Sequence, residues 1–298
     1  MGIVNVTPDS FSDGGRFLDA DAAIAHGLGL RAAGAAILDV GGESTRPGAD
    51  PVDPAREQER VLPVVAALAA AGATVSIDTM HADTAVAAVA AGARIVNDVS
   101  GGLADPEMLP AVAASGADIV LQHWRGPSAD MYAGARYTDL AAELTRELGE
   151  RVRAAAAAGI SPDRVIIDPG IGFGKRGPQN WQALRALDRV VALGPRVLVG
   201  TSRKRFLGDV LRKASIGDPG GGGGGDPAAA APVGEAGAPG SPVDGARLDL
   251  ATAVTSVLAA QAGVWAVRVH DAASTRDALA VASAWASGPA GHGGSGDA

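Results

Sequence analysis

Short apolar runs recur along the chain, and polar or glycine-rich residues follow each of them. The first run is residues 2–5, and seven later runs each follow a glycine that closes an alanine-rich segment. Those glycines are Gly34, Gly72, Gly92, Gly116, Gly159, Gly194 and Gly263. A glycine just past a helix typically ends it in the left-handed conformation, and short continuous apolar runs are typical of strands covered on both faces. The pattern therefore predicts eight alternating strand and helix units.

The runs give the expected positions of the strands. They lie at residues 2–5, 37–40, 75–78, 95–98, 119–122, 165–168, 197–200 and 266–269. Eight such units indicate the α/β fold class, as a (β/α)8 TIM barrel. In this fold the loops at the carboxyl ends of the strands carry the chemistry, so a functional site is expected there.

Two segments lie outside this pattern. Residues 214–246, after the seventh strand, hold six consecutive glycines and five prolines but no aromatic residue, lysine or arginine. Such a composition cannot bury enough apolar surface to order a chain, so we expect a disordered Gly/Pro/Ala-rich loop insertion. Residues 287–298 are expected to form a disordered tail for the same reason. The rest, about 250 residues, has the usual size of one barrel, so residues 1–286 should form a single domain.

Charge and composition exclude several classes of function. The formal net charge is −8, which disfavours nucleic acid and anionic membranes as partners. The chain has no cysteine, so disulfides, thiolate nucleophiles and cysteine zinc sites are excluded. No charged segment with an apolar stretch opens the chain, and no run of about 18 apolar residues occurs. We therefore expect a cytoplasmic protein that does not span a membrane.

The loops after the first two strands indicate an anionic ligand. Residues 5–15 are dense in short polar side chains and turn formers, although an ordinary turn would explain them equally well. Residues 41–48 contain three glycines and Arg46. Glycines let backbone N–H groups approach an anion, and an arginine can donate two hydrogen bonds to phosphate oxygens. Two such loops on neighbouring strands favour a phosphate-binding site.

Polar residues also follow five of the later strands. They are Asp78, Asn97 with Asp98, Asp168, the cluster at residues 202–205, and Arg268 with His270. A single aspartate at a strand end is most often a helix cap or a turn residue. A barrel, however, brings all these strand ends into one cleft. Together they suit a polar planar ligand that carries an anionic tail.

These segments together resemble the dihydropteroate synthase family of folate biosynthesis. The resemblance extends from residue 1 to about residue 285 and is most specific at residues 5–15, 39–48, 76–79, 97–102, 168–175, 200–208 and 268–271. It implies the condensation of 6-hydroxymethyl-7,8-dihydropterin diphosphate with p-aminobenzoate to give 7,8-dihydropteroate and pyrophosphate. It also implies a homodimer, as is usual in the family, and a target of sulfonamides.

The resemblance assigns the pterin ring to residues on five strand ends. Asp168 would accept two hydrogen bonds from the pterin's amino-pyrimidinone edge, which resembles a guanidinium. Asn97 would both donate to and accept from the neighbouring ring nitrogens. Lys204 would donate to the ring carbonyl and N5, and Asp78 would accept from the ring N–H on the other side. Arg268 would stack on the ring and reach the phosphate.

The resemblance also assigns the diphosphate and the second substrate. Asn5 would ligate Mg²⁺, a hard ion that takes oxygen ligands and substrate phosphates. The anion site would be completed by Thr45, Arg46, Arg268 and His270. Pyrophosphate would leave first, and Asp13 would stabilise the cationic pterin methylene. The p-aminobenzoate pocket would be shaped by Phe11, Ser12 and Pro47. The residues expected to take part in catalysis are Asp13, Arg46, Lys204, Arg268 and His270.

Two other functions share parts of this pattern. Pterin-binding methyltransferases that serve corrinoid proteins share the barrel and the pterin-binding residues, but they need neither diphosphate loops nor the lysine. A non-catalytic pterin-binding paralogue should have lost loop residues. The complete loops at residues 7–13 and 44–47 favour the synthase. The chain departs from the family pattern at Gln122, where an apolar residue is more usual, and at Arg205, where small residues are common.

Overall fold

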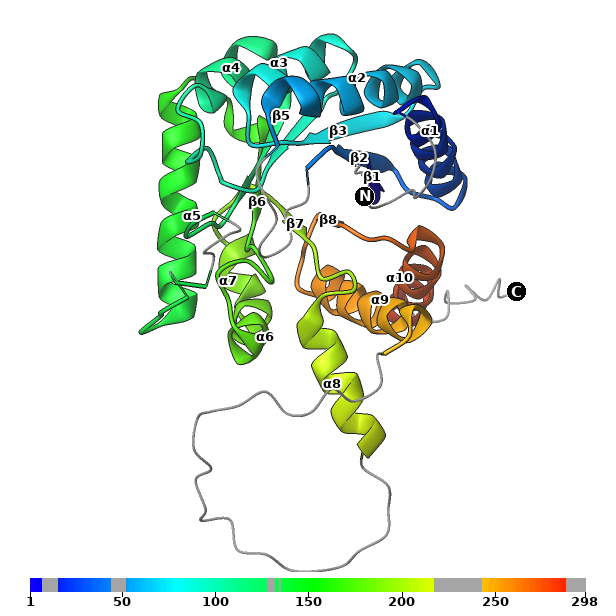
Figure 1. Cartoon of the computed structure of the whole chain (residues 1–298). Coiled ribbons are helices and arrows are strands. Elements are labelled where there is room, and N and C mark those ends of the chain that lie inside the picture. Colours follow the sequence, from blue (N-terminus) through cyan, green and yellow to red (C-terminus); the bar gives the residue numbers. More distant parts are fainter. Residues whose placement is uncertain (7–15, 44–51, 128–131, 134, 217–242, 288–298) are drawn as a thin grey trace, which may run out of the picture.

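The computed structural model describes residues 1–6, 16–43, 52–127, 132–133, 135–216 and 243–287. Strands and helices alternate along the chain (Figure 1). The strands are β1 (Gly2–Asn5), β2 (Ile37–Gly41), β3 (Thr74–Asp78), β4 (Ile95–Asp98), β5 (Asp118–Gln122), β6 (Val165–Asp168), β7 (Arg196–Val199) and β8 (Ala266–Val267). The helices are α1 (Arg16–Ala32), α2 (Pro54–Ala70), α3 (Ala82–Ala90), α4 (Met108–Ser115), α5 (Leu140–Ala157), α6 (Gly177–Arg185), α7 (Leu187–Val191), α8 (Arg205–Ile216), α9 (Gly245–Gln261) and α10 (Ala272–Ser287), with a 3₁₀ turn at Pro162–Arg164.

The eight strands form one parallel sheet in sequential order, β1 to β8. The sheet returns to its beginning, because Gly2 pairs in parallel with Val269 just after β8. Ile3 N–H donates to Val269 O over 3.1 Å, and Val269 N–H donates to Met1 O over 2.9 Å. The (β/α)8 TIM barrel predicted from the apolar runs is therefore confirmed.

The seven glycines that suggested helix ends all have left-handed backbones, with φ between 77° and 112°. At Gly92 a Cβ atom would also lie 2.7 Å from the Cβ of Ala69, so a side chain would clash there. Aspartates cap the first turns of α2, α5 and α9: Asp53 accepts from the Ala55 N–H over 3.0 Å, Asp139 from the Ala142 N–H over 3.1 Å, and Asp244 from the Arg247 N–H over 2.7 Å. Such caps contribute about 1 kcal/mol each.

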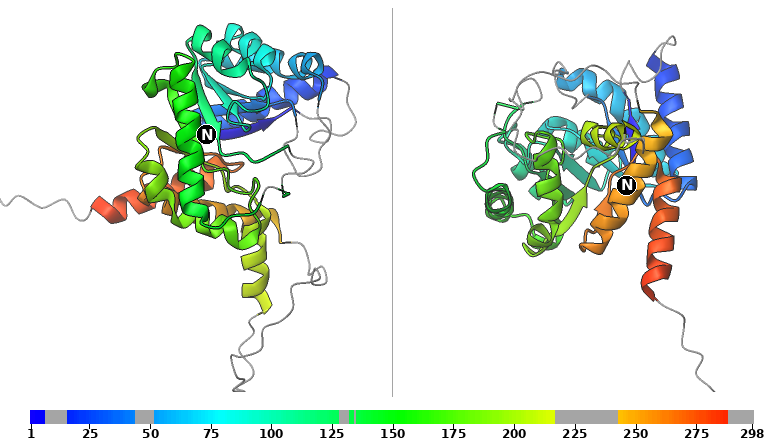
Figure 2. Two further views of the ribbon diagram at one scale, coloured as in Figure 1. Left: turned by 90° about the vertical axis from the view of Figure 1, so that its left-hand side faces the viewer. Right: turned by 90° about the horizontal axis from the view of Figure 1, so that it is seen from below.

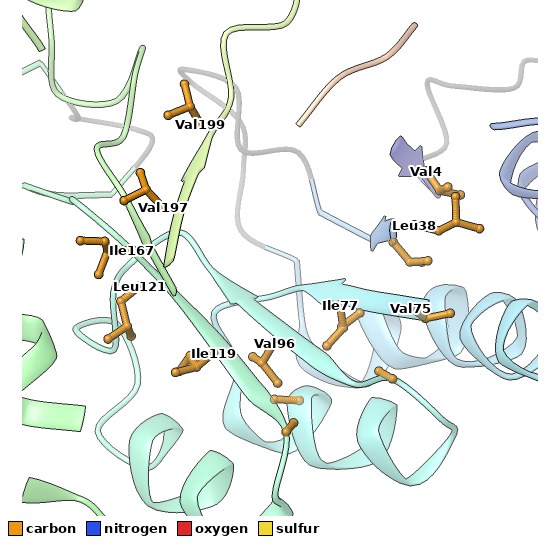
Figure 3. Close-up of a cluster of buried hydrophobic side chains, with 14 of the residues drawn as sticks. Val4, Leu38, Val75, Ile77, Val96, Ile119, Leu121, Ile167, Val197 and Val199 are labelled. Carbon is orange, nitrogen blue, oxygen red and sulfur yellow. The ribbon is translucent and has the colours of Figure 1, made fainter. Parts of the chain in front are cut away.

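The larger hydrophobic core lies between the strands and the helices that surround them. Val4, Leu38, Ile77, Ile119 and Val197 point outward from their strands into this layer (Figure 3). A second and much smaller core fills the inside of the barrel and comprises Ile37, Ile95, Val120, Ile166 and Leu198. Both faces of each strand are therefore buried, because helices pack against the outer face and side chains of other strands pack against the inner face. This explains why the runs are continuously apolar.

The inner core also explains where the polar residues go. Side chains two positions apart on a strand point to the same face. Two residues beyond the inner-core residues Ile37, Ile95, Val120 and Ile166 come the polar residues Asp39, Asn97, Gln122 and Asp168. These four side chains consequently form a polar layer directly above the apolar one, at the carboxyl end of the barrel.

The structure corrects the boundaries of the predicted loop and tail. The loop was expected at 214–246, but α8 continues to Ile216 and α9 already begins at Gly245. Residues 217–242 lie outside the described part of the chain, so the expected disorder there stays a prediction. The tail was expected at 287–298, but α10 includes Ser287; residues 288–298 lie outside the described part of the chain. Helices can extend into segments of poor composition when neighbouring turns are already formed.

The last expected strand, at residues 266–269, is also shorter than its apolar run. β8 comprises Ala266 and Val267 alone, and the chain then continues through Arg268, whose N–H donates to Val199 O over 2.9 Å. Within the described ranges, no helix combines the length and apolar character that a membrane crossing requires.

Candidate active site

Three polar side chains from three neighbouring strands lie around one arginine. Arg268, which follows β8, donates from Nε to Asp39 Oδ2 over 2.6 Å and from Nη2 to Asp78 Oδ2 over 2.7 Å. Asn97 Nδ2 donates to the same Asp39 oxygen over 3.0 Å. The two aspartates and the asparagine are buried, and Arg268 is 22% exposed. We call Asp39, Asp78, Asn97 and Arg268 the arginine cluster.

The charges in the arginine cluster balance only in part. Burial lowers the pKa of Arg268, but Asp39 and Asp78 outweigh it and hold that pKa above the ordinary range. Burial raises the pKa of Asp78 to about 7, and the opposing effect of Arg268 does not cancel it. One arginine therefore faces two buried carboxyls, and Asp78 changes its charge near neutral pH.

Asp168 and Lys204 form a second charged group at the same end of the barrel. Asp168 ends β6, is 5% exposed, and accepts from the Gly170 N–H over 2.6 Å. Lys204 Nζ donates to Ile171 O and lies 4.9 Å from the centre of the Phe173 ring. Burial lowers the pKa of Lys204 to about 8 while Asp168 opposes the change. Burial raises the pKa of Asp168, and Lys204 opposes that change. The opposite charges thus stabilise each other.

His270 is oriented by a serine on the preceding strand's loop. The backbone N–H of His270 donates to Ser202 Oγ over 3.0 Å, and Ser202 Oγ lies 2.8 Å from His270 Nδ1. Because Ser202 Oγ already accepts one hydrogen bond, its own hydrogen is available to donate to Nδ1. The structure therefore supplies a fixed orientation for His270 that the sequence did not predict.

Several of the polar residues at the strand ends do not enter the site. Asp98, next to Asn97, accepts from Ser100 N, Ser100 Oγ and Gly102 N, each over 2.7 Å. It therefore organises the turn after β4, as an isolated aspartate usually does. Arg203 has a left-handed φ of 54° and pairs with Asp249 on α9 through two bonds of 2.7 Å. Its side chain thus lies on the outer surface.

Six of the expected site residues lie outside the described part of the chain. They are Phe11, Ser12, Asp13, Thr45, Arg46 and Pro47. Asn5 is described: it ends β1, pairs in register with Gly41 and is half-buried. The structure therefore brings Asn5, Asp78, Asn97, Asp168, Lys204, Arg268 and His270 to one end of the barrel, at or just after the carboxyl ends of their strands.

The sequence analysis assigned no role to Asp39 and left open how Gln122 fits into the polar layer. Asp39 sits inside an apolar run, yet it joins Arg268 to Asn97. The signal was a charged residue in a run otherwise made of apolar side chains. Gln122 replaces an apolar family residue, and its Nε2 donates to Val99 O over 3.2 Å while the side chain is buried. The glutamine is therefore satisfied rather than left with an unpaired polar group.

Comparison with known proteins identifies the family. A family model described as pterin binding enzyme matches residues 1–270. The chain is 51% identical over 288 residues to the dihydropteroate synthase of Mycobacterium leprae, covering 96% of this chain and 92% of that protein. The chain therefore belongs to the pterin binding enzyme family.

Solved structures identify the activity within that family. The Xanthomonas albilineans dihydropteroate synthase with 4-aminobenzoic acid has a TM-score of 0.82 at 41% identity, over 97% of this chain and 93% of that one. The same enzyme with 7,8-dihydropteroate has a TM-score of 0.79 at 39% identity, over 97% and 94%. The chain has the activity of a dihydropteroate synthase, a transferase of folate biosynthesis, so the synthase predicted from the sequence motifs is confirmed.

Proposed function

We propose that the arginine cluster, together with Asp168 and Lys204, holds the pterin ring of 6-hydroxymethyl-7,8-dihydropterin diphosphate. The observation that supports this most directly is the convergence of Asp78, Asn97, Asp168 and Lys204 above the inner core. Buried carboxyls, an amide and an amine provide acceptors and donors around one flat ligand. The second substrate would be p-aminobenzoate, as in the Xanthomonas albilineans complex.

The hydrogen bonds within the cluster leave suitable groups for the ring. One N–H of the Asn97 amide is used by Asp39, so its second N–H and its carbonyl oxygen remain to pair with adjacent ring positions. Asp168 would accept from the amino group and the neighbouring ring N–H. Lys204 would donate to the ring carbonyl and N5, and Asp78 would accept from the N–H on the other side. Each charge-assisted bond of this kind is worth about 1.5–3 kcal/mol.

The anionic tail would be bound beside Arg268 and His270, which follow the carboxyl end of β8. Arg268 has five donors, of which Nε and Nη2 point to Asp39 and Asp78. Its other N–H groups would donate to phosphate oxygens, with His270 beside them. Thr45 and Arg46, from the loop after β2, would complete this anion site. Fixed donors at this point stabilise the charge that develops on the departing pyrophosphate.

The chemistry of Asn5 fits Mg²⁺ as the metal. Within the described ranges, no group of three or more histidine, aspartate or glutamate side chains is arranged to hold a metal ion. Mg²⁺ is commonly bound by one or two protein oxygens together with substrate phosphates and water, so the single amide oxygen of Asn5 would suffice. When bound, Mg²⁺ would neutralise charge on the diphosphate.

The remaining proposal concerns the carbon–nitrogen bond. The pyrophosphate would leave first, and Asp13 would stabilise the pterin methylene cation. The aniline nitrogen of p-aminobenzoate, placed by Phe11, Ser12 and Pro47, would then attack that carbon. This nitrogen is already a neutral nucleophile at pH 7, so the attack needs no general base, and the ammonium that forms would release its proton to water. Positioning and electrostatics would supply most of the rate enhancement.

A pyrophosphate-release assay tests this proposal. The purified protein is given pterin diphosphate and Mg²⁺, with and without p-aminobenzoate, and dihydropteroate is followed in parallel. We expect pyrophosphate and dihydropteroate to appear in equal amounts only when p-aminobenzoate is present. Pyrophosphate release without p-aminobenzoate would indicate hydrolysis, and pterin binding without release would indicate a non-catalytic protein. Loss of activity on chelation that Mg²⁺ restores would support the metal.

We also propose that two copies of the chain associate through α9. Leu250, Val254 and Leu258 lie four residues apart on this helix and are 66%, 52% and 57% exposed. They form an apolar stripe along α9, a helix that lies beside α10 (Figure 2). An exposed apolar stripe of this kind is typical of an interface, and a twofold dimer would cover it with its own copy. The cytoplasmic location and the lack of nucleic-acid and membrane partners remain predictions from the sequence.

Val254→Glu should therefore produce a monomer. A charge at the centre of the stripe would be buried against an apolar partner surface, which costs several kcal/mol. Light scattering after size exclusion measures the mass. Val86→Glu is the matched control, because Val86 is 49% exposed on α3 and away from α9. A dimer that survives Val254→Glu would contradict this interface.

A further inference from the structure

A glycine-rich segment, residues 170–175, supports the two charged residues of the pterin site. Gly170, Gly172 and Gly174 have φ values of 64°, 86° and 55°. A Cβ atom on Gly170 would lie 2.3 Å from His123 O, and one on Gly172 would lie 2.9 Å from Lys204 Cδ. The glycines thus permit a close approach to the site. Three glycines in six residues also leave the segment with little intrinsic rigidity.

The segment contacts both Asp168 and Lys204 through its backbone. Gly170 N–H donates to Asp168 Oδ1 over 2.6 Å, and Ile171 O accepts from Lys204 Nζ. The Phe173 ring lies under the Lys204 amine. A displacement of this backbone would therefore move an acceptor and a donor of the pterin ring at once.

Lys175 fixes this segment from behind. Its side chain is 1% exposed, and Nζ donates to Gly170 O over 3.0 Å and to Phe173 O over 3.2 Å. The third neighbour is His123 Nδ1, at 3.0 Å. Burial lowers the pKa of Lys175 to about 7, and Asp168 opposes the change. In its protonated form the ammonium has three donors and no acceptor, so it can donate to all three neighbours.

The state of His123 is set by a carboxylate on α5. Burial lowers the pKa of His123 to about 4, so the ring is neutral at pH 7. Its Nε2 lies 2.9 Å from Glu147 Oε2. Burial raises the pKa of Glu147, but hydrogen bonds from His123 and Arg125 outweigh it and lower the pKa to about 2. Arg125 donates to Glu147 from Nε over 2.9 Å and from Nη2 over 2.5 Å.

The contacts of His123 fix which of its ring nitrogens carries the hydrogen. Ionised Glu147 can only accept, so Nε2 of His123 carries the hydrogen. The neutral ring then presents a lone pair at Nδ1, which accepts from Lys175. The surface pair of Arg125 with Glu147 thus sets the tautomer of His123, and His123 in turn completes the acceptors of Lys175.

We propose that Lys175 is a positioning residue for the pterin site. Its hydrogen bonds to two carbonyls of residues 170–175 fix Asp168 and Lys204 relative to each other. His123, which is itself bonded to Glu147, orients the Lys175 amine. This inference rests on the proposed placement of the pterin ring between Asp168 and Lys204. None of Lys175, His123 or Glu147 contacts the ligand in this account.

Steady-state kinetics of Lys175→Met test the proposal. We expect KM for the pterin diphosphate to rise at least tenfold and KM for p-aminobenzoate to stay within about twofold, because the segment supports one subsite only. A variant that merely folds less well would lower the active fraction, so that kcat falls while both KM values stay the same. Arg196→Met is the control: it removes a long cation that pairs with Asp118 and does not contact the segment.

Glu147→Gln gives an independent test should Lys175→Met fail to fold. A glutamine has one acceptor oxygen where Glu147 presents two to His123 and Arg125, so the hydrogen on Nε2 is held less firmly and the lone pair of Nδ1 faces Lys175 for less of the time. We expect the pterin KM to rise at least threefold, again without change in the p-aminobenzoate KM. Wild-type pterin KM in Glu147→Gln, or in a folded Lys175→Met, would overturn the proposal. If the wild-type protein itself does not turn over the pterin substrate, the proposed function fails instead.

Discussion

Asp78→Asn should make the ligand-free protein more stable at neutral pH while it removes activity. Asp78 is 8% exposed at the end of β3, and Oδ2 accepts from Arg268 Nη2 over 2.7 Å. Burial raises its pKa from the ordinary 3.8 to about 7 against the effect of Arg268. The nearby Asp39 adds to the rise. The carboxyl is therefore held in an unfavourable environment.

The size of the stability gain follows from the proton that Asp78 takes up when the chain folds. In the unfolded chain Asp78 is ionised at pH 7, and each pKa unit corresponds to about 1.4 kcal/mol. A rise from 3.8 to about 7 sets an upper limit of about 4 kcal/mol on the cost at pH 7. Asparagine needs no proton and can still accept from Arg268, so we expect a gain of about 1–4 kcal/mol at pH 7.

The sign of the pH dependence follows from the same shift. The folded protein binds this proton more tightly than the unfolded chain, so the contribution of Asp78 to stability is full below pH 3.8 and is lost as the pH rises through about 7. The advantage of Asp78→Asn should therefore grow between about pH 4 and pH 7 and stay constant above it. Denaturant unfolding of both proteins at several pH values measures the difference.

The control is Asp118→Asn, the same chemical change in a partly exposed pair. Asp118 is 29% exposed and lies 2.7 Å from Arg196, so its loss should change stability by less than about 1 kcal/mol. Pyrophosphate release should fall in Asp78→Asn because a ring N–H loses its charged acceptor. An Asp78→Asn protein that is less stable than wild type at pH 7 would refute the reasoning, because the ion pair with Arg268 would then outweigh burial.

Three further predictions address other parts of the molecule. Asp168→Asn should lower kcat/KM for pyrophosphate release at least ~100-fold, about 2.7 kcal/mol, with an unchanged melting temperature; activity within a few-fold of wild type would remove Asp168 from the site. Asp98→Ala should instead lower the unfolding free energy by about 2–4 kcal/mol, since three local donors lose their acceptor, and a neutral result in denaturant melts would exclude that role. Replacing residues 217–242 with a few glycines should leave stability and turnover nearly unchanged; a melting temperature lower by many degrees would show that the segment packs.

The fold was predictable because its two signals are local. A glycine with a left-handed backbone closes each of seven helices, and a helix end of this kind depends on a few neighbouring residues. An apolar run between two polar segments likewise marks a strand covered on both faces. Strand order then follows from the short connections, because consecutive parallel strands joined by a helix usually lie side by side. The limits of the loop after β7 and the length of β8 differed most, and several other boundaries differed by one residue.

The site was predictable only where a side chain's direction could be inferred. Asn97 and Asp98 are adjacent and equally polar, but strand alternation sends one into the barrel and the other into its turn. Ser100 and Gly102, which bind Asp98, follow it closely in the sequence and could have indicated the turn. Asp39 was hidden because its run was treated as uniformly apolar. Considered with a period of two, the run has a charged residue on its inner face.

Lys175 could not be recognised from the sequence for a different reason. A lysine in a glycine-rich loop beside a predicted phosphate-binding site suggests a solvated or phosphate-binding side chain. Its burial results from contacts with His123 on the neighbouring strand's loop, 52 residues away, and from the turn that it closes. Such long-range contacts depend on how β5 and β6 are paired, which no local pattern of residues gives.

The site contains buried polar groups that are incompletely paired, and this lowers the stability of the barrel. Asp39 Oδ2 serves both Arg268 and Asn97, while its Oδ1 is buried and has no hydrogen-bond partner among the described residues. An unsatisfied buried acceptor costs about 1–3 kcal/mol. A second carboxyl, Asp78, competes for the same arginine. This cost is tolerable because the layer beneath is an apolar core closed on itself by β1 and β8. A ligand that donates hydrogen bonds to these carboxyls and presents an anion to Arg268 would pair the unsatisfied groups. The incomplete pairing itself therefore favours a flat, donor-rich ring with an anionic tail.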